Sequence, residues 1–104
     1  MDCIFCKIVN KELPADIVYE NENVLAFKDI HPKAAVHILV VPKIHIESIN
    51  SENSENIVGD LILAAKNIIK RDNITGYKLL FNIGREGGQM VDHLHMHLLA
   101  GNPS

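Results

Sequence analysis

Three short apolar stretches in the first half of the chain have the length and composition of β-strands. Residues 17–19 and 24–27 flank the polar segment 20–23, which predicts a β-hairpin. Residues 36–41 are rich in β-branched side chains and end at Pro42, as is typical of a strand inside a sheet. We therefore expect three consecutive strands in this half of the protein.

Two other segments carry apolar residues at helical spacing. Residues 3–11 form the first, which predicts a short helix that ends before Pro14. Residues 51–72 form the second, with apolar side chains every three or four positions along one face. Acidic residues in its first turn and basic residues in its last turn suit the helix dipole.

The last third of the chain returns to alternation. Residues 77–83 and 93–99 are the predicted final strands, and a glycine-containing loop at 84–88 lies between them. The order of elements contains no regular β-α-β repeat. It therefore predicts an α+β fold with a mostly antiparallel sheet.

Composition limits the classes of protein that remain. The 104 residues, of which 47% are hydrophobic, predict a single globular domain over residues 1–104. Ten basic and thirteen acidic side chains give a net charge of −3, which disfavours general nucleic-acid binding. No apolar run approaches the roughly twenty residues of a membrane span, and no signal sequence is visible, so we expect a cytoplasmic protein.

The two cysteines, Cys3 and Cys6, have the spacing C-x-x-C. In a reducing compartment this spacing indicates half of a metal site or a redox motif, and disfavours a structural disulfide. A thioredoxin-like motif would follow a strand and open a longer helix. The position of this pair at the start of the chain therefore favours metal binding.

The most informative pattern is the alternation of His93, His95 and His97, three of the six histidines in the chain. On one strand their rings share a face at spacings of about 6.6 Å, with the intervening apolar side chains on the other face. Imidazoles titrate near neutral pH, and three neighbours cannot all be protonated together. One neutral ring could attack a phosphoryl group whose negative charge the other rings stabilise.

Two alternatives remain open at this point. The histidines could be half-exposed strand residues without a function, or they could bind zinc. Just upstream, Gly87 and Gly88 could bring backbone N–H groups close to a phosphate, and Gln89 offers an amide donor. A glycine pair in a loop is also found in ordinary turns.

Taken together, these segments resemble the histidine triad (HIT) superfamily, and the compact length is similar to its Hint-like branch of nucleoside phosphoramidases. The resemblance rests on Gly88-Gln89-x-x-x-His93-x-His95-x-His97-Leu98-Leu99 and on residues 4–8, 26–30 and 37–46. It implies a five-stranded antiparallel sheet with one long and one short helix, and a homodimer with a ten-stranded sheet. It also implies hydrolysis of purine nucleoside phosphoramidates or adenylates, without a catalytic metal.

The resemblance also implies roles for individual residues. His95 would be the nucleophile that forms a nucleotidyl-histidine, with His97 and His37 contacting the phosphate or supporting His95. Asp29 would bind ribose, because a carboxylate can accept hydrogen bonds from both hydroxyls of a diol. Phosphate and ribose would lie against Asn82, Gly88, Gln89 and Met90, and the purine against Phe5, Ile8, Phe27, Ile30 and Leu39.

In bacterial relatives that carry the cysteine pair, the resemblance implies a structural zinc. Its ligands here would be Cys3, Cys6, His45 and His93, a closed tetrahedral set. The alternative is that Cys3 is a frayed terminal residue and Cys6 a core thiol. The remaining histidine, His31, receives no role.

Met90 departs from the pattern of the Hint-like branch, where serine is usual. Methionine offers no hydroxyl, although its backbone N–H can still contact a phosphate. We therefore expect weaker handling of the leaving group. Met90 also keeps a second hypothesis open, a purine nucleotide-binding regulatory protein with weak or vestigial catalysis. A third hypothesis is a metal enzyme that uses the three histidines.

Overall fold

A computed structural model describes residues 3–101 of the chain. Met1 and Asp2, on which part of the expectation of no signal sequence rests, lie outside these residues. Within the described part, five strands form one antiparallel sheet in the order β1-β2-β3-β5-β4. They are β1 Ile17–Glu20, β2 Val24–Lys28, β3 Val36–Pro42, β4 Tyr77–Leu80 and β5 Met96–Ala100.

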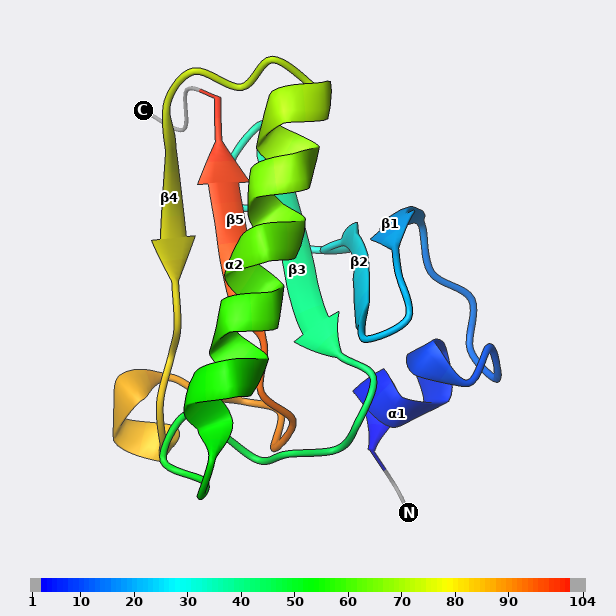
Figure 1. Cartoon of the computed structure of the whole chain (residues 1–104), viewed down its shortest axis with the longest axis vertical. Helices are drawn as coiled ribbons and strands as arrows, with labels where there is room; N and C mark the ends of the chain where they lie inside the picture. The colour runs from blue at the N-terminus through cyan, green and yellow to red at the C-terminus, as the bar shows by residue number, and fades with distance from the viewer. Residues whose placement is uncertain (1–2, 102–104) are drawn as a thin grey trace.

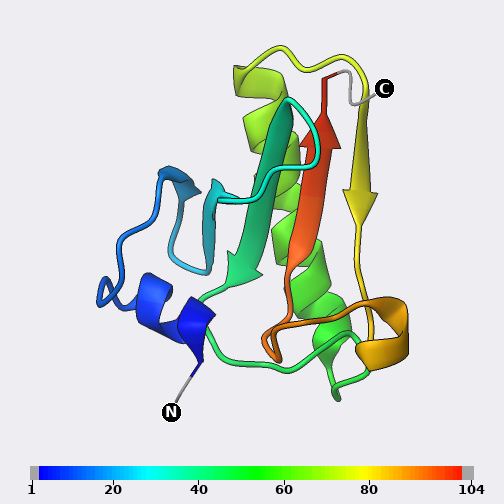
Figure 2. The same cartoon turned by 180° about the vertical axis from the view of Figure 1, so that it is seen from behind.

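Two α-helices accompany this sheet, α1 Ile4–Val9 and α2 Ser54–Arg71, together with a single 3-10 turn, η1 Arg85–Gly87, in the described chain. Helix α2 runs along one face of the sheet (Figure 1). From behind, the central strands lie uncovered by α2, and α1 sits beside β2 and the end of β3 (Figure 2). The expected α+β fold with a five-stranded antiparallel sheet is confirmed.

The core between α2 and the sheet forms because both elements are apolar on the faces that meet. Leu61, Ala65 and Ile68 of α2 are fully buried, as the helical spacing predicts. They pack in one cluster with Met96 and Leu98 of β5. A smaller cluster lies on the opposite face of the sheet, where α1 packs, and contains Cys3, Phe5, Ile8, Leu25, Phe27, Leu39 and Val41.

The predicted ends of several elements differ from the structure. Helix α2 begins at Ser54 instead of residue 51, and β4 ends at Leu80 instead of residue 83. The last strand begins at Met96, so His93 and His95 precede it. The pair of Val40 and Met96 is the last one between β3 and β5. The carbonyl of Pro42 instead accepts from the ring of His93.

The strand register positions side chains on the face that α2 leaves uncovered. Leu80 on β4 lies opposite His97 on β5, and His97 lies opposite Leu39 on β3, which faces Phe27 on β2. This row crosses four strands and runs from β4 toward α1. Among the described residues, no helix is long and apolar enough to cross a membrane.

Candidate active site

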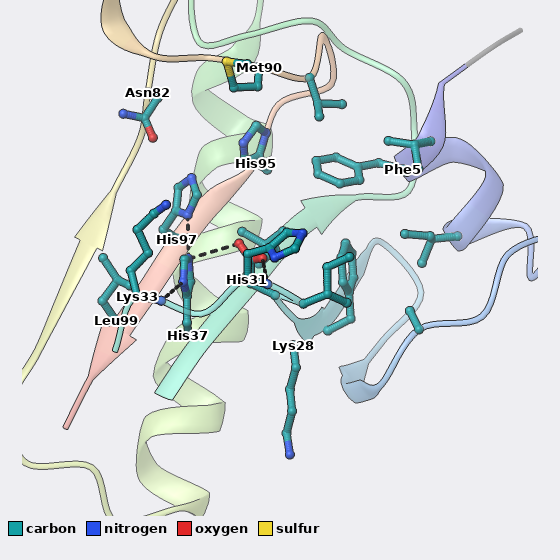
Figure 3. Close-up of a pocket in the computed structure, with 18 of the residues that line it drawn as sticks. Phe5, Lys28, His31, Lys33, His37, Asn82, Met90, His95, His97 and Leu99 are labelled. Atoms are coloured by element: carbon teal, nitrogen blue, oxygen red, sulfur yellow. Dashed lines mark hydrogen bonds and ion pairs between the residues drawn. The ribbon is translucent and has the colours of Figure 1, made fainter. Parts of the chain in front are cut away.

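A pocket of about 790 Å³ opens on the sheet face away from α2 (Figure 3). Figure 3 shows Phe5 on one side and His97, Lys33 and Leu99 on the other, with His95 and Met90 above them. The wall near α1 is apolar, and the opposite side carries imidazoles and an ammonium group. Such a cavity can hold a flat apolar ring at one end and an anion at the other.

Almost all of the residues expected to act in catalysis or to bind the nucleotide line this one pocket. The apolar group comprises Phe5, Ile8, Phe27, Ile30, Leu39 and Met90, and the remaining expected residues are Asp29, His37, Asn82, Gly88, His95 and His97. Ile30 and Met90 are its most exposed large apolar members, at 85% and 81%. They therefore lie at the mouth of the pocket.

Gln89 is the exception, because its side chain does not reach the pocket. The side chain is buried, and its Oε1 accepts from the backbone N–H of Gly84 at 3.0 Å. Its Nε2 donates to the carbonyls of Glu47 at 2.7 Å and Val91 at 3.0 Å. The Gln89 amide therefore holds the glycine loop together in this structure, and its expected contact with a nucleotide stays a prediction.

The loop between β4 and β5 has a fixed shape for further reasons. Arg85 donates to the carbonyl of Gln89 and pairs with Asp92 at 3.0 Å. Gly88 has φ +90, and a Cβ at this position would meet the Asn82 amide at 3.4 Å. Glycine is therefore needed for this turn to approach Asn82. The Asn82 Nδ2 donates to the carbonyl of Gly87 at 2.9 Å.

The ring of His95 has one defined tautomer in this structure. Its Nδ1 lies 2.8 Å from the carbonyl oxygen of His93. Because a carbonyl can only accept, Nδ1 carries the proton and Nε2 keeps a lone pair. His95 lines the pocket, and its ring lies 5.1 Å from the ring of His97 between centroids. A neutral imidazole with a fixed lone pair is a competent nucleophile at neutral pH.

His37 and His97 form a directed chain of hydrogen bonds. The backbone N–H of Lys33 donates to Nδ1 of His37 at 3.0 Å, so the proton of this ring is on Nε2. That Nε2–H lies 2.9 Å from Nδ1 of His97, which must then accept. His97 consequently carries its own proton on Nε2, and the chain ends in one N–H donor on a pocket-lining ring.

Burial favours the neutral form of the His37 and His97 rings. Desolvation lowers the pKa of His97 to about 4, and the neighbouring His95 and His37 rings contribute in the same direction. Desolvation also lowers the pKa of His37, although the carboxylate of Asp29 opposes it. That carboxylate lies 3.4 Å from His37 Nε2 and accepts from the backbone N–H of His31 at 2.8 Å.

The four residues expected to bind metal do come together. Their nearest ligand atoms all lie within 4.8 Å of one another. The Sγ of Cys3 is 3.3 Å from Nδ1 of His93, and the Sγ of Cys6 is 3.3 Å from Nδ1 of His45. Cys3 is also the N-cap of α1, so the cluster joins the first helix to two distant segments.

The hydrogen bonding around His93 fits a metal ligand. Its Nε2 donates to the carbonyl of Pro42 at 2.9 Å, which leaves Nδ1 with a lone pair directed at the sulfurs. Metal-binding histidines commonly donate their other ring nitrogen to a carbonyl in this way. Two thiols and two imidazoles are a donor set that zinc prefers. Burial and the nearby Cys3 raise the pKa of the Cys6 thiol to about 11, which a bound cation would reverse.

The three alternating histidines do not share one ligand cluster. The ring of His93 faces the cysteines, whereas His97 groups with Asp29 and His37. In that second group, His37 Nδ1 already accepts a backbone N–H, so its Nε2 is protonated. A metal there would have to displace this proton. The geometry therefore favours a hydrogen-bond relay over the metal enzyme.

Sequence reasoning missed several residues of the pocket. Lys33 aligns His37 through its backbone, and no motif marks it. The further lining residues are Ile4, Leu13, Pro14, Ala15, Lys28, His31, Leu80, Val91 and Leu99. The strand register could have indicated Leu80 and Leu99, because both share a sheet face with His97.

Comparisons with known proteins agree with this geometry. A family model described as scavenger mRNA decapping enzyme C-term binding matches residues 2–103. The chain is 45% identical over 106 residues to a protein named purine nucleoside phosphoramidase from Escherichia coli strain K12, which covers 98% of this chain and 89% of that protein.

Solved structures give the same result. A histidine triad protein from Clostridium difficile matches with a TM-score of 0.93 and 46% identity, covering 98% of this chain and 92% of the other. A HIT family hydrolase from Legionella pneumophila matches with a TM-score of 0.91 and 41% identity, covering 97% and 94%. The fold and the alternating histidines define the class of histidine triad proteins, and this chain belongs to that family. Within the family it resembles the Hint-like branch, as the sequence predicted.

Proposed function

We propose that the protein is a nucleotide hydrolase or transferase that cleaves purine nucleoside phosphoramidates or adenylates through a covalent nucleotidyl-His95. The observation that carries the proposal is the hydrogen bond from His95 Nδ1 to the His93 carbonyl, which leaves the Nε2 lone pair free for attack. The relative named purine nucleoside phosphoramidase supports this class of substrate.

In the first step, Nε2 of His95 attacks the phosphorus and a P–N bond to the ring forms. The bond to the leaving group breaks and its electron pair stays on that group, which takes up a proton from solvent when it is an amine. His97 Nε2–H stabilises the charge that develops on a phosphoryl oxygen. In the second step, water attacks the phosphorus, the nucleotide is released, its proton passes to solvent, and His95 regains its lone pair.

The other pocket residues would bind the nucleotide. The apolar wall that includes Phe5 and Phe27 would take the purine, and the Asp29 carboxylate would accept from the ribose hydroxyls. Asn82 and the backbone of Gly88 and Met90 would contact the phosphate, since they line the same pocket as His95.

The experiment that tests the proposal is trapping of the intermediate. Protein mixed with adenosine 5′-phosphoramidate and quenched in denaturant within milliseconds should carry one adenylyl group, detected by intact mass spectrometry. His95→Gln should carry none and should lose turnover. A wild-type protein that binds AMP but turns over no phosphoramidate or adenylate would overturn the enzymatic proposal.

The second candidate function is nucleotide binding without significant catalysis. Met90 favours it, because its exposed side chain stands at the pocket mouth and offers no donor to a leaving group. In that case AMP affinity would be high, and turnover would be equally small in the wild type and in His95→Gln.

We also propose that the Cys3, Cys6, His45 and His93 cluster holds a structural zinc. The donor set and the tautomer of His93 support it. When bound, zinc would supply a closed tetrahedral link between α1 and the sheet, without a role in the reaction.

A homodimer is the proposed assembly. Strand β4 is an edge strand, and Tyr77 and Leu80 on it are 45% and 43% exposed. Leu63 on the outer side of α2 is 56% exposed. A second copy that pairs along β4 would cover this edge and continue the sheet. Sedimentation of the wild type should give a dimer, and Leu63→Glu should shift the equilibrium toward monomer.

A further inference from the structure

The nucleotide pocket continues into a second hollow that the catalytic proposal does not use. This hollow has a volume of about 400 Å³ and lies along the end of β5 and the start of β4. Lys33 and Leu99 line both cavities, and Lys78 and Tyr77 line only the hollow. Figure 3 shows Lys33 and Leu99 beside His97 and His37, on the side away from Phe5.

Among the residues that the structure describes, the lining of the hollow contains no acidic side chain. Lys33 and Lys78 are the charged residues in that described lining, and both are exposed. Within residues 3–101, neither ammonium group lies within ion-pair distance of a carboxylate. The lysines at positions 11, 28 and 43 do have such partners. Two unpaired cations at one cavity suit an anionic ligand.

The strand register explains why Lys78 faces this side. Lys78 lies opposite Leu99, and Leu99 lies opposite His37, so the three share the sheet face that carries the pocket. Leu79, the next residue on β4, packs against the α2 core instead. Strand pairing through β4 would use backbone groups, so a homodimer would leave Lys78 on the pocket face.

The position of the hollow relative to His95 indicates which part of a bound nucleotide would lie in it. His95 precedes His97 in the chain and Leu99 follows it, so His95 and the hollow lie on opposite sides of His97 (Figure 3). In phosphoryl transfer the nucleophile and the leaving group lie roughly in line across the phosphorus. With the phosphorus bound at His97, between His95 and the hollow, a group that leaves opposite His95 would lie toward Lys33 and Lys78.

We propose that Lys33 and Lys78 form a subsite for an anionic leaving group, so that the protein prefers nucleotides whose departing part carries a carboxylate or a phosphate. The inference rests on the proposed function and specifies its substrate class. The ammonium of Lys33 also lowers the pKa of His37 and His97, which indicates that its charge reaches the site. The Met90 side chain offers no donor to a leaving group. Contacts with Lys33 and Lys78 would stabilise an anionic leaving group without that donor.

The test compares two substrates that differ in one charge. Both are adenosine 5′-phosphoramidates, one of β-alanine and one of β-alaninamide. For the wild type, kcat/KM should be about tenfold higher for the carboxylate substrate, as expected for one charge-assisted contact, and the ratio should shrink as salt is added. In Lys33→Met/Lys78→Met the ratio should fall about tenfold. The matched control is Lys66→Met, which removes one exposed charge from α2 and should keep the wild-type ratio.

Failure of the subsite and failure of the enzyme can be told apart by binding. ADP should displace a fluorescent AMP analogue about tenfold more tightly than AMP does in the wild type, and equally in the double variant. An ADP-to-AMP affinity ratio that is the same in both proteins overturns the subsite, whatever the activity. If the ADP-to-AMP affinity ratio differs between the two proteins as expected but neither substrate is turned over, the proposed enzyme is overturned and the subsite is supported. Single Lys78→Met and Lys33→Met variants, checked by circular dichroism, serve if the double variant misfolds.

Discussion

The backbone carbonyl of His93 lies 2.8 Å from Nδ1 of His95, so one residue serves two sites. The ring of His93 faces Cys3 and Cys6, while its main chain sets the tautomer of His95. Phe5 packs edge-on against both rings, with centroid distances of 5.9 Å and 5.1 Å. The candidate metal cluster of Cys3, Cys6, His45 and His93 and the candidate nucleophile are therefore parts of one packed unit.

Removal of a metal ligand should destabilise the protein. Cys6→Ser should lose bound zinc on elemental analysis, and its unfolding free energy should fall by about 4 kcal/mol where free zinc exceeds the dissociation constant about a thousandfold. AMP affinity should fall as well, because α1 carries Phe5 and Ile8 of the pocket wall. His31→Ala is the control for zinc content and stability, since His31 lies outside the cluster. Lys66→Ala is the control for AMP affinity, since Lys66 on α2 lies outside the pocket lining. Zinc content that is equally low in the wild type would contradict the metal proposal.

The relay predicts an order of effects among the histidines. His97→Phe removes the donor that lines the pocket, and kcat/KM for adenosine 5′-phosphoramidate should fall about a hundredfold or more. His37→Phe removes only the group that orients His97, so its loss should be smaller, about tenfold. Steady-state kinetics measures both. A larger loss for His37→Phe than for His97→Phe would mean that His37 itself contacts the substrate.

The lowered pKa of His97 makes stability depend on pH. Between pH 6.5 and about 4 the unfolded chain binds a proton at this residue and the native chain does not. Stability is therefore highest above pH 6.5 and is lost as the pH falls toward 4. The loss should be about 1 to 2 kcal/mol, since solvent at the pocket screens part of the shift.

Urea denaturation at pH 7 and pH 4.5 measures this loss, and His97→Gln should show a smaller difference between the two pH values. The ring protons of His97 should titrate near pH 4 in NMR spectra. A midpoint close to the ordinary value of 6.5 would show that the ring is more solvated than the structure indicates.

Restoring a hydroxyl at position 90 should assist the leaving group. Met90→Ser should raise phosphoramidate turnover by up to about tenfold, the worth of one hydrogen bond. The effect should appear in kcat with an amine leaving group and be weaker with a phosphate. Met90→Ala separates the new hydroxyl from the loss of the methionine side chain. Equal rates for the serine and alanine variants would refute the role assigned to the hydroxyl.

The turn after β5 depends on glycine. Gly101 has φ +80, and a Cβ there would stand 2.6 Å from the Cβ of Ala35. Gly101→Ala should therefore lower the unfolding free energy by about 1 to 3 kcal/mol. Gly76→Ala is the matched control, because its Cβ would meet nothing within 4 Å. Thermal melts of the two variants should differ, and similar midpoints would contradict the predicted clash.

Periodicity predicted the kinds of elements better than their contacts. The spacing of Leu61, Ala65 and Ile68 located the buried face of α2, because a helix packing on a sheet needs such a stripe. Alternation wrongly extended the last strand to His93. A pattern of period two cannot report that the carbonyl of Pro42 bonds a side chain instead of a neighbouring strand.

In the candidate site, too, the residues could be predicted from the sequence but their contacts could not. Resemblance indicated which residues gather in the pocket, but not which nitrogen of each ring carries a proton. The tautomer of His37 follows from a backbone N–H at Lys33, and backbone groups leave no mark in a sequence. Gln89 was assigned to the ligand because an amide can donate, whereas its partners are backbone groups of the chain itself.

The first and last residues of the candidate metal cluster, Cys3 and His93, are 90 positions apart in the sequence. Helix α1 has six residues, which is too short to be stable in isolation. During synthesis the α1 wall of the pocket would leave the ribosome well before His93 and would be fixed only once His93 has emerged. A nascent chain would then be unable to bind nucleotide until His93 has been translated.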